Sequence, residues 1–117
     1  MKHTEKGLFG ENLACDYLQN LDFEIIRRNF RYKKGEIDII CKKNGLLIFV
    51  EVKYRTSDAF GMPENSVDLK KKKIFLRTAN EYIFQEDWQN DIRFDIIAIL
   101  HKSNQNPEIM HFEDAFY

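Results

Sequence analysis

Residues 35–55 decide the fold, and they read GEIDIICKKNGLLIFVEVKYR. Two apolar runs flank a short polar turn, and that pattern is typical of a β-hairpin. We therefore expect a strand from Gly35 to Lys42, a turn at Lys43-Asn44-Gly45, and a strand from Leu46 to Tyr54. The second strand begins as a continuous apolar run, which indicates a central strand covered on both faces.

The flanking sequence predicts two helices and three more strands. The first helix has an apolar face that includes Ala14, Leu18 and Leu21, and Ser66 or Asn65 is the expected cap of the second. The expected elements are a helix over about 4–20, a strand over 23–32, the hairpin, a helix over about 67–85, a buried strand over 93–100 and a short peripheral strand over 109–112. This order predicts an α/β fold with a mixed central sheet flanked by helices.

Length and composition point to one globular domain over residues 1–117. The chain is 44% hydrophobic and 32% charged, and it is long enough to bury one core without disulfides. No apolar run approaches the roughly 20 residues of a membrane span, and the N-terminus lacks the apolar region of a signal peptide. Cys15 and Cys41 show no metal-ligand spacing, so we expect buried free thiols in a cytoplasmic protein that does not enter the membrane.

Charge clusters more than the net charge of −1 suggests. Basic residues gather in two segments, Arg27–Lys34 and Lys70–Lys73. A neutral protein can bind phosphates if its basic groups share one face, whereas scattered groups are only a solvated surface. Arg28, Arg31 and Arg55 are the candidate phosphate contacts, because guanidinium groups match phosphate oxygens.

Charged residues also interrupt the apolar hairpin. Glu51 and Lys53 are two apart and project from one face of a strand, and pairing across the turn can bring Asp38 beside Glu51. Facing carboxylates repel, and a divalent cation relieves that repulsion. Asp38, Glu51 and the Val52 carbonyl could thus hold Mg²⁺ or Mn²⁺ for phosphodiester hydrolysis, with Lys53 orienting water or stabilising charge on phosphorus. A same-face ion pair of Glu51 with Lys53 is the purely structural alternative.

Two further charged residues fall on the apolar faces of the predicted helices, and a third has two expected roles. Glu11 falls on the apolar face of the first helix, and Lys71 falls on that of the second. Glu36 either supports the site behind the ligands or forms a salt bridge. For the histidines at 3, 101 and 111 we expect surface roles rather than ligation, and the aromatic residues show no interleaved stacking platform.

Five blocks of sequence together resemble the YraN-like family of small bacterial proteins, which is similar to the archaeal Holliday-junction resolvases within the restriction-endonuclease-like PD-(D/E)xK superfamily. The blocks are Gly10-Glu11-Asn12-Leu13-Ala14, Arg28-Asn29-Phe30-Arg31, residues 35–40 with 49–55, Val67 through Lys71, and Arg93-Phe94-Asp95. The proline of the PD-(D/E)xK pattern, which many members lack, is absent before Asp38, where Ile37 stands.

The resemblance implies an α-β-β-β-α-β core with Asp38, Glu51 and Lys53 as the catalytic set. It also implies that Glu11 completes metal binding and that Lys71 lies near the site. The expected function is a Mg²⁺- or Mn²⁺-dependent endonuclease acting on DNA, with branched DNA suggested by analogy with the resolvases. Small nucleases of this type often pair to cut two strands, so a homodimer is compatible. A non-catalytic nucleic-acid-binding accessory protein of the same fold is the alternative.

Overall fold

The computed structural model describes residues 5–56 and 69–115. Along the chain these form α1 (Glu5–Asn20), β1 (Glu24–Tyr32), β2 (Gly35–Lys43), β3 (Leu46–Arg55), α2 (Leu69–Glu86), β4 (Ile92–Leu100) and β5 (Glu108–Phe112). This is the predicted α/β order of a restriction-endonuclease-like core, and the element ends lie within about two residues of those expected. The expected cap at Ser66 or Asn65 and the first residues of both predicted helices lie outside the described residues.

The five strands form one mixed sheet in the order β1-β2-β3-β4-β5. Sequence neighbours pair antiparallel except β3 and β4, which run parallel because α2 lies between them in the chain. The β2–β3 turn contains Asn44 at φ 53° and Gly45 at φ 79°. Both residues are left-handed, as a two-residue type I′ hairpin requires, so Lys43 belongs to the strand and not to the turn.

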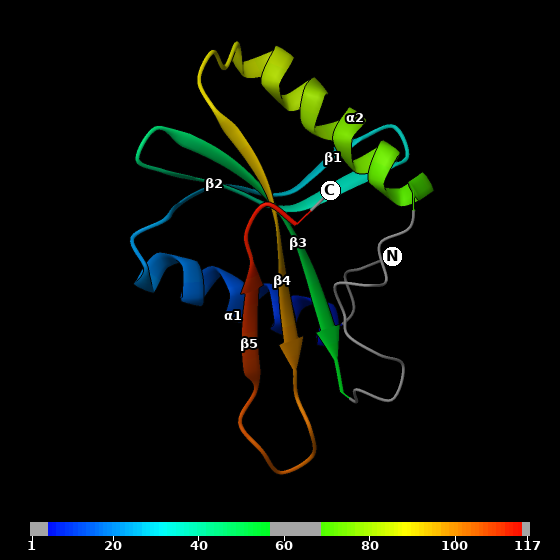
Figure 1. Cartoon of the computed structure of the whole chain (residues 1–117). Coiled ribbons are helices and arrows are strands. Elements are labelled where there is room, and N and C mark those ends of the chain that lie inside the picture. The colour runs from blue at the N-terminus through cyan, green and yellow to red at the C-terminus, as the bar shows by residue number, and fades with distance from the viewer. Residues whose placement is uncertain (1–4, 57–68, 116–117) are drawn as a thin grey trace.

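One helix covers each face of this sheet (Figure 1). Ala14 and Leu18 of α1 pack with Val50 and Val52 in one core. On the other face Phe75 and Tyr82 of α2 pack in a second core with the aliphatic and aromatic side chains of the strands. Each strand of the hairpin is thus covered on both sides, as its continuous apolar run predicts. No helix in the described part of the chain is long and apolar enough to cross a membrane.

Two details of the first helix and the C-terminal strands depart from expectation. Leu21 lies beyond the end of α1 and its side chain is 43% exposed, so it does not share the buried face with Ala14 and Leu18. His111, expected at the surface, is almost fully buried beside Asp95 in β4. Cys15 and Cys41 are buried free thiols as predicted, and burial raises the pKa of Cys41 to about 12.

A glycine sets how closely α2 approaches the sheet. A methyl group added at Gly35 would collide with the hydroxyl of Thr78 and would lie 3.0 Å from Cγ2 of Ile74. Only glycine therefore allows α2 to pack at this distance over the start of β2. This contact brings the N-terminal turns of α2 over the hairpin.

Candidate functional site

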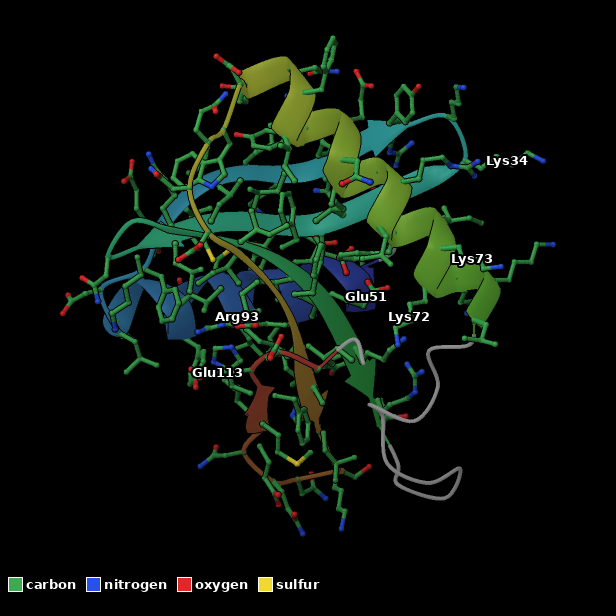
Figure 2. The ribbon with its side chains drawn as sticks, turned by 45° about the horizontal axis from the view of Figure 1, so that its top comes forward. Lys34, Glu51, Lys72, Lys73, Arg93 and Glu113 are labelled. Atoms are coloured by element: carbon green, nitrogen blue, oxygen red, sulfur yellow. The ribbon has the colours of Figure 1, made fainter. Side chains whose placement is uncertain are left out.

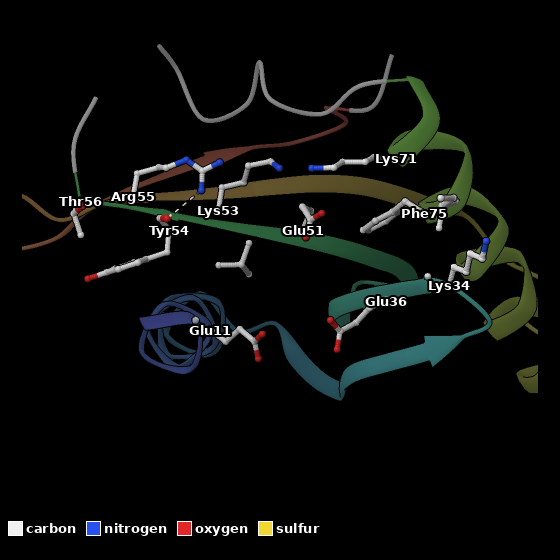
Figure 3. A pocket seen from close by; sticks show the side chains of 14 residues that line it. Glu11, Lys34, Glu36, Glu51, Lys53, Tyr54, Arg55, Thr56, Lys71 and Phe75 are labelled. Carbon is white, nitrogen blue, oxygen red and sulfur yellow. Dashed lines mark hydrogen bonds between the residues drawn. The ribbon is translucent and has the colours of Figure 1, made fainter. Parts of the chain in front are cut away.

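A cavity of about 670 Å³ opens beside the second half of β3 (Figure 3). Elements from both faces of the sheet contribute to its walls. The lining residues are Gly7, Glu11, Lys34, Gly35, Glu36, Glu51, Val52, Lys53, Tyr54, Arg55, Thr56, Lys71, Ile74 and Phe75. Apart from Asp38, all the predicted catalytic and metal-binding residues are on this wall, together with Arg55, Lys71 and Glu36 of the other predicted site residues.

The cavity lies where β2 and β3 stop pairing. Their antiparallel register runs from Lys43 opposite Leu46 to Ile39 opposite Val50 and then stops. Continued by one step, it would place Asp38 opposite Glu51, as the hairpin predicted. Instead the fully buried Asp38 carboxylate accepts a hydrogen bond through Oδ2 from the Val52 amide at 2.7 Å. Asp38 therefore closes the gap between the strands behind the cavity wall.

Charged side chains of β3 and α2 meet over this gap. Glu51 and Lys53 lie on the face opposite Val50 and Val52, as the strand spacing predicted. The Lys53 side chain is only 8% exposed. Figure 3 shows the side chains of Lys53 and Lys71 pointing toward one another across the cavity, with Glu51 beneath them. Two ammonium groups and a carboxylate thus line one side of the cavity.

Glu11 reaches the cavity from α1. Its side chain is 2% exposed, and its Oε1 lies 3.4 Å from the NH2 group of Arg28. Its Oε2 is buried and has no hydrogen-bond partner among the described residues. Burying a carboxylate oxygen without a hydrogen-bond partner destabilises the folded protein unless a cation or a hydrogen-bond donor occupies the adjacent space.

The predicted phosphate-binding arginines occupy different positions. Arg28 pairs across the sheet with Ile39, whose side chain packs in the α1-side core, so Arg28 reaches Glu11. Arg31 donates from Nε to Oε2 of Glu36 at 3.0 Å, so Glu36 forms the expected salt bridge while also lining the cavity. Only Arg55 of the three arginines lines the cavity, and its NH1 donates to the Tyr54 carbonyl at 3.1 Å.

The donor set suits a hard divalent cation that keeps water ligands. Mg²⁺ in proteins usually binds one or two carboxylates and retains several waters. Among the described residues no three His, Cys, Asp or Glu side chains gather closely enough to form a protein-only metal cage. The unpartnered Glu11 oxygen and the Glu51 carboxylate on the same cavity nevertheless supply the oxygen ligands that Mg²⁺ or Mn²⁺ prefers.

Several basic residues near the cavity were not singled out from the sequence. Lys34 lines it from the β1–β2 turn. Figure 2 places Lys34, Lys72 and Lys73 on one side of the molecule, while Arg93 and Glu113 lie on the other. The two basic segments of the sequence were the available signal, but only the packing of α2 over Gly35 brings them together.

A second buried polar group lies away from the cavity. Asp95 accepts hydrogen bonds from both ends of the Arg93 guanidinium at 2.8 and 2.9 Å, and the His111 ring lies 2.7 Å from its Oδ2. The Asp114 amide adds a fourth contact at 3.1 Å. Burial alone would raise the pKa of Asp95, but the hydrogen bonds from His111 and Arg93 outweigh it and hold that pKa below its usual range. This group ties β5 and the segment after it to β4.

Comparison with known proteins assigns the family. The sequence model of the family described as "Uncharacterised protein family UPF0102" matches residues 10–99 of this chain. That range includes every predicted site residue. This chain belongs to the UPF0102 family, the YraN family. The resemblance drawn from the hairpin and its flanking blocks is therefore confirmed.

UPF0102 relatives match this chain over nearly its whole length. A UPF0102 protein of Clostridium beijerinckii is 45% identical over 120 residues, covering 99% of this chain and 98% of the relative. One from Flavobacterium psychrophilum is 42% identical over 116 residues, covering 99% and 97%. One from Persephonella marina is 42% identical over 112 residues, covering 95% and 92%.

Proposed function

We propose that this UPF0102 protein is a metal-dependent endonuclease that hydrolyses phosphodiester bonds in DNA. The observation that carries the proposal is the shared cavity of Glu11, Glu51 and Lys53, in which a buried carboxylate oxygen of Glu11 has no partner among the described residues. Buried charges gathered in a cavity are typical of a reactive or ion-binding site.

The proposal gives each residue a role. Glu51 and Glu11 would hold Mg²⁺ or Mn²⁺ from the cavity, and the ion when bound would lower the pKa of a water and polarise a phosphoryl oxygen. The Val52 carbonyl and Asp38 are the other predicted ligands, and the Asp38 carboxylate, which does not line the cavity, would have to turn toward the ion. Lys53 would stabilise the negative charge that develops on the phosphoryl group, for which a compact ammonium is suited. The hydrogen bond from Val52 to Asp38 would hold the two strands in the separated arrangement.

Substrate binding would use basic residues that line the cavity. Arg55 and Lys71 line the cavity and would bind phosphate groups on either side of the reacting one. Arg28 and Arg31 each contact a carboxylate through one nitrogen, on Glu11 and Glu36 respectively, so their predicted phosphate contacts would use their remaining N–H groups. The preference for branched DNA rests on the resemblance to resolvases, and a homodimer and a cytoplasmic location remain predictions.

One observation favours a second candidate, a non-catalytic nucleic-acid-binding accessory protein. Glu11 contacts the Arg28 guanidinium, and that cation offsets part of the charge that a metal ion would neutralise. Such a protein would bind nucleic acid through Arg55 and the lysines that line the cavity without cleaving it.

Incubation of the purified protein with labelled duplex, single-stranded and four-way-junction DNA distinguishes these candidates. Each DNA is tested with Mg²⁺, Mn²⁺ or EDTA, and Lys53→Ala is compared with Lys73→Ala, an exposed lysine of α2 outside the cavity lining. The endonuclease proposal expects metal-dependent cleavage that is lost in Lys53→Ala and kept in Lys73→Ala. Binding without cleavage under every condition would instead support the accessory protein.

A further inference from the structure

Three rings from distant parts of the chain meet at one end of the cavity. Phe9 of α1 stacks on His101, with ring centroids 5.6 Å apart and 26° between the planes. The ring of Tyr54 meets Phe9 edge-on at 5.8 Å, and the Tyr54 hydroxyl lies 2.8 Å from Nδ1 of His101. The sequence indicated no stacking platform because these residues lie in three separate segments.

This cluster is continuous with the cavity. Tyr54 and Arg55 both line the cavity, and the His101 amide donates a hydrogen bond to the Arg55 carbonyl at 2.8 Å. Gly10, next to Phe9, lets α1 lie against Tyr54, because an added methyl group there would be 3.0 Å from the Tyr54 Cβ. Arg55 is therefore linked to two of the three rings, because it follows Tyr54 in the chain and its carbonyl accepts a hydrogen bond from the His101 amide.

Phe9 differs from an ordinary surface phenylalanine. Its side chain is 42% exposed, yet two neighbouring rings hold it in place. Phe84, near the C-terminal end of α2, is 81% exposed and has no ring partner among the described residues. Proteins bind unpaired nucleobases by stacking them on exposed aromatic rings, while basic side chains along the same path bind the phosphates. Phe9 supplies such a ring, and Arg55 supplies a basic side chain in the adjoining cavity.

We propose that the Phe9–His101 stack binds an unpaired nucleobase of the DNA strand that occupies the cavity. The phosphate of that nucleotide contacts Arg55, and the strand continues from there past Lys53. This inference rests on the proposed function and names its substrate class: DNA with a single-stranded segment next to the cleaved bond. A blunt, fully paired duplex keeps its bases stacked inside the helix and cannot offer one to Phe9.

Binding measured in EDTA tests this without any cleavage. A short oligonucleotide carrying 2-aminopurine, whose fluorescence falls when it stacks, is titrated with the wild-type protein and with Phe9→Ala, Phe9→Tyr and Phe84→Ala. The same oligonucleotide is then tested as a blunt duplex. Because Phe9 is half-exposed, its replacement is not expected to unfold the protein, and thermal unfolding of each variant verifies this.

Stacking of one base corresponds to about 5- to 150-fold in affinity. We expect Phe9→Ala to lose that much affinity for the single strand together with the fluorescence change, whereas Phe9→Tyr and Phe84→Ala keep both. Duplex binding is expected to change little in any variant. Equal single-strand affinity of Phe9→Ala and the wild type would overturn this inference while leaving the nuclease proposal intact. A wild-type protein that binds no single strand would also overturn this inference, whereas the nuclease proposal is decided separately by the cleavage assay with Mg²⁺.

Discussion

The Val52 amide donates a hydrogen bond to Oδ2 of Asp38 across 2.7 Å, at the point where β2 and β3 stop pairing. A side-chain oxygen thus takes the place that a backbone carbonyl of β2 would occupy in a continued hairpin. The separation leaves space for Glu11 from one face of the sheet and Lys71 from the other. One acidic residue therefore both closes a gap in the sheet and lies behind the candidate site.

Asp38→Asn and Asp38→Ala separate the hydrogen bond from the charge. Both variants remove the carboxylate, but only asparagine keeps an oxygen that can accept from the Val52 amide. An unsatisfied buried amide costs about 1–3 kcal/mol, so we expect Asp38→Ala to be less stable than Asp38→Asn by that amount in urea unfolding. Equal free energies of unfolding for the two variants would show that the bond does not support the sheet.

Glu11→Gln tests whether the buried α1 carboxylate is a metal ligand. We expect the Mn²⁺ affinity measured by calorimetry to fall at least about tenfold, because an oxygen charge at the cavity is lost. Glu36→Gln is the matched control, since the Glu36 carboxylate also lines the cavity but pairs with Arg31. A similar loss in both variants, or none in Glu11→Gln, would argue for a structural role of Glu11.

Gly35→Ala tests the approach of α2 to the hairpin. The added methyl group meets the Thr78 hydroxyl and lies 3.0 Å from Ile74 Cγ2, and such overpacking costs about 1–3 kcal/mol. In combination with Thr78→Ala the loss is expected to be less than the sum of the two single losses, because the colliding hydroxyl is gone. Strict additivity in urea unfolding would contradict this packing.

The lowered pKa of Asp95 predicts an acid-dependent loss of stability. An aspartate titrates near 3.9 in the unfolded chain, so its contribution is complete above that pH and is lost as the pH falls through the lower folded-state pKa. The difference in free energy of unfolding between the wild type and Asp95→Asn should therefore narrow as the pH falls below about 4. Glu113→Gln, whose carboxylate is 3.6 Å from Arg93 and 60% exposed, should change stability by under about 1 kcal/mol. A difference that does not narrow in acid would place the Asp95 pKa at its ordinary value.

The sequence predicted the fold well because its signals are local. The Asn44-Gly45 turn sets the register of β2 against β3, and the spacing of Glu51 and Lys53 places both on one face. The separation of the strands after Ile39 and Val50 could not be predicted in this way, because it appears only in the assembled sheet, where the side chain of Asp38 replaces a backbone partner.

Side-chain contacts between elements that are distant in the sequence also could not be predicted. Arg28 contacts Glu11 because a register shift in β1 after Ile25 determines which face its side chain occupies. The burial of His111 likewise depends on Asp95 in the neighbouring strand, and β5 is too short for its alternation to indicate this. Helical and strand periodicity carry no information about such contacts.

The central claim is tested most directly by the rate of DNA cleavage in Mg²⁺. The wild type and Glu51→Gln are each given a pool of labelled duplex, single-stranded and junction DNA. Glu36→Gln is the control for loss of a cavity carboxylate. The proposal predicts cleavage that EDTA abolishes, a rate at least about 100-fold lower in Glu51→Gln, and a rate close to wild type in Glu36→Gln. Cleavage that persists in EDTA or in Glu51→Gln, or a wild type that cleaves none of the three DNAs, would contradict it.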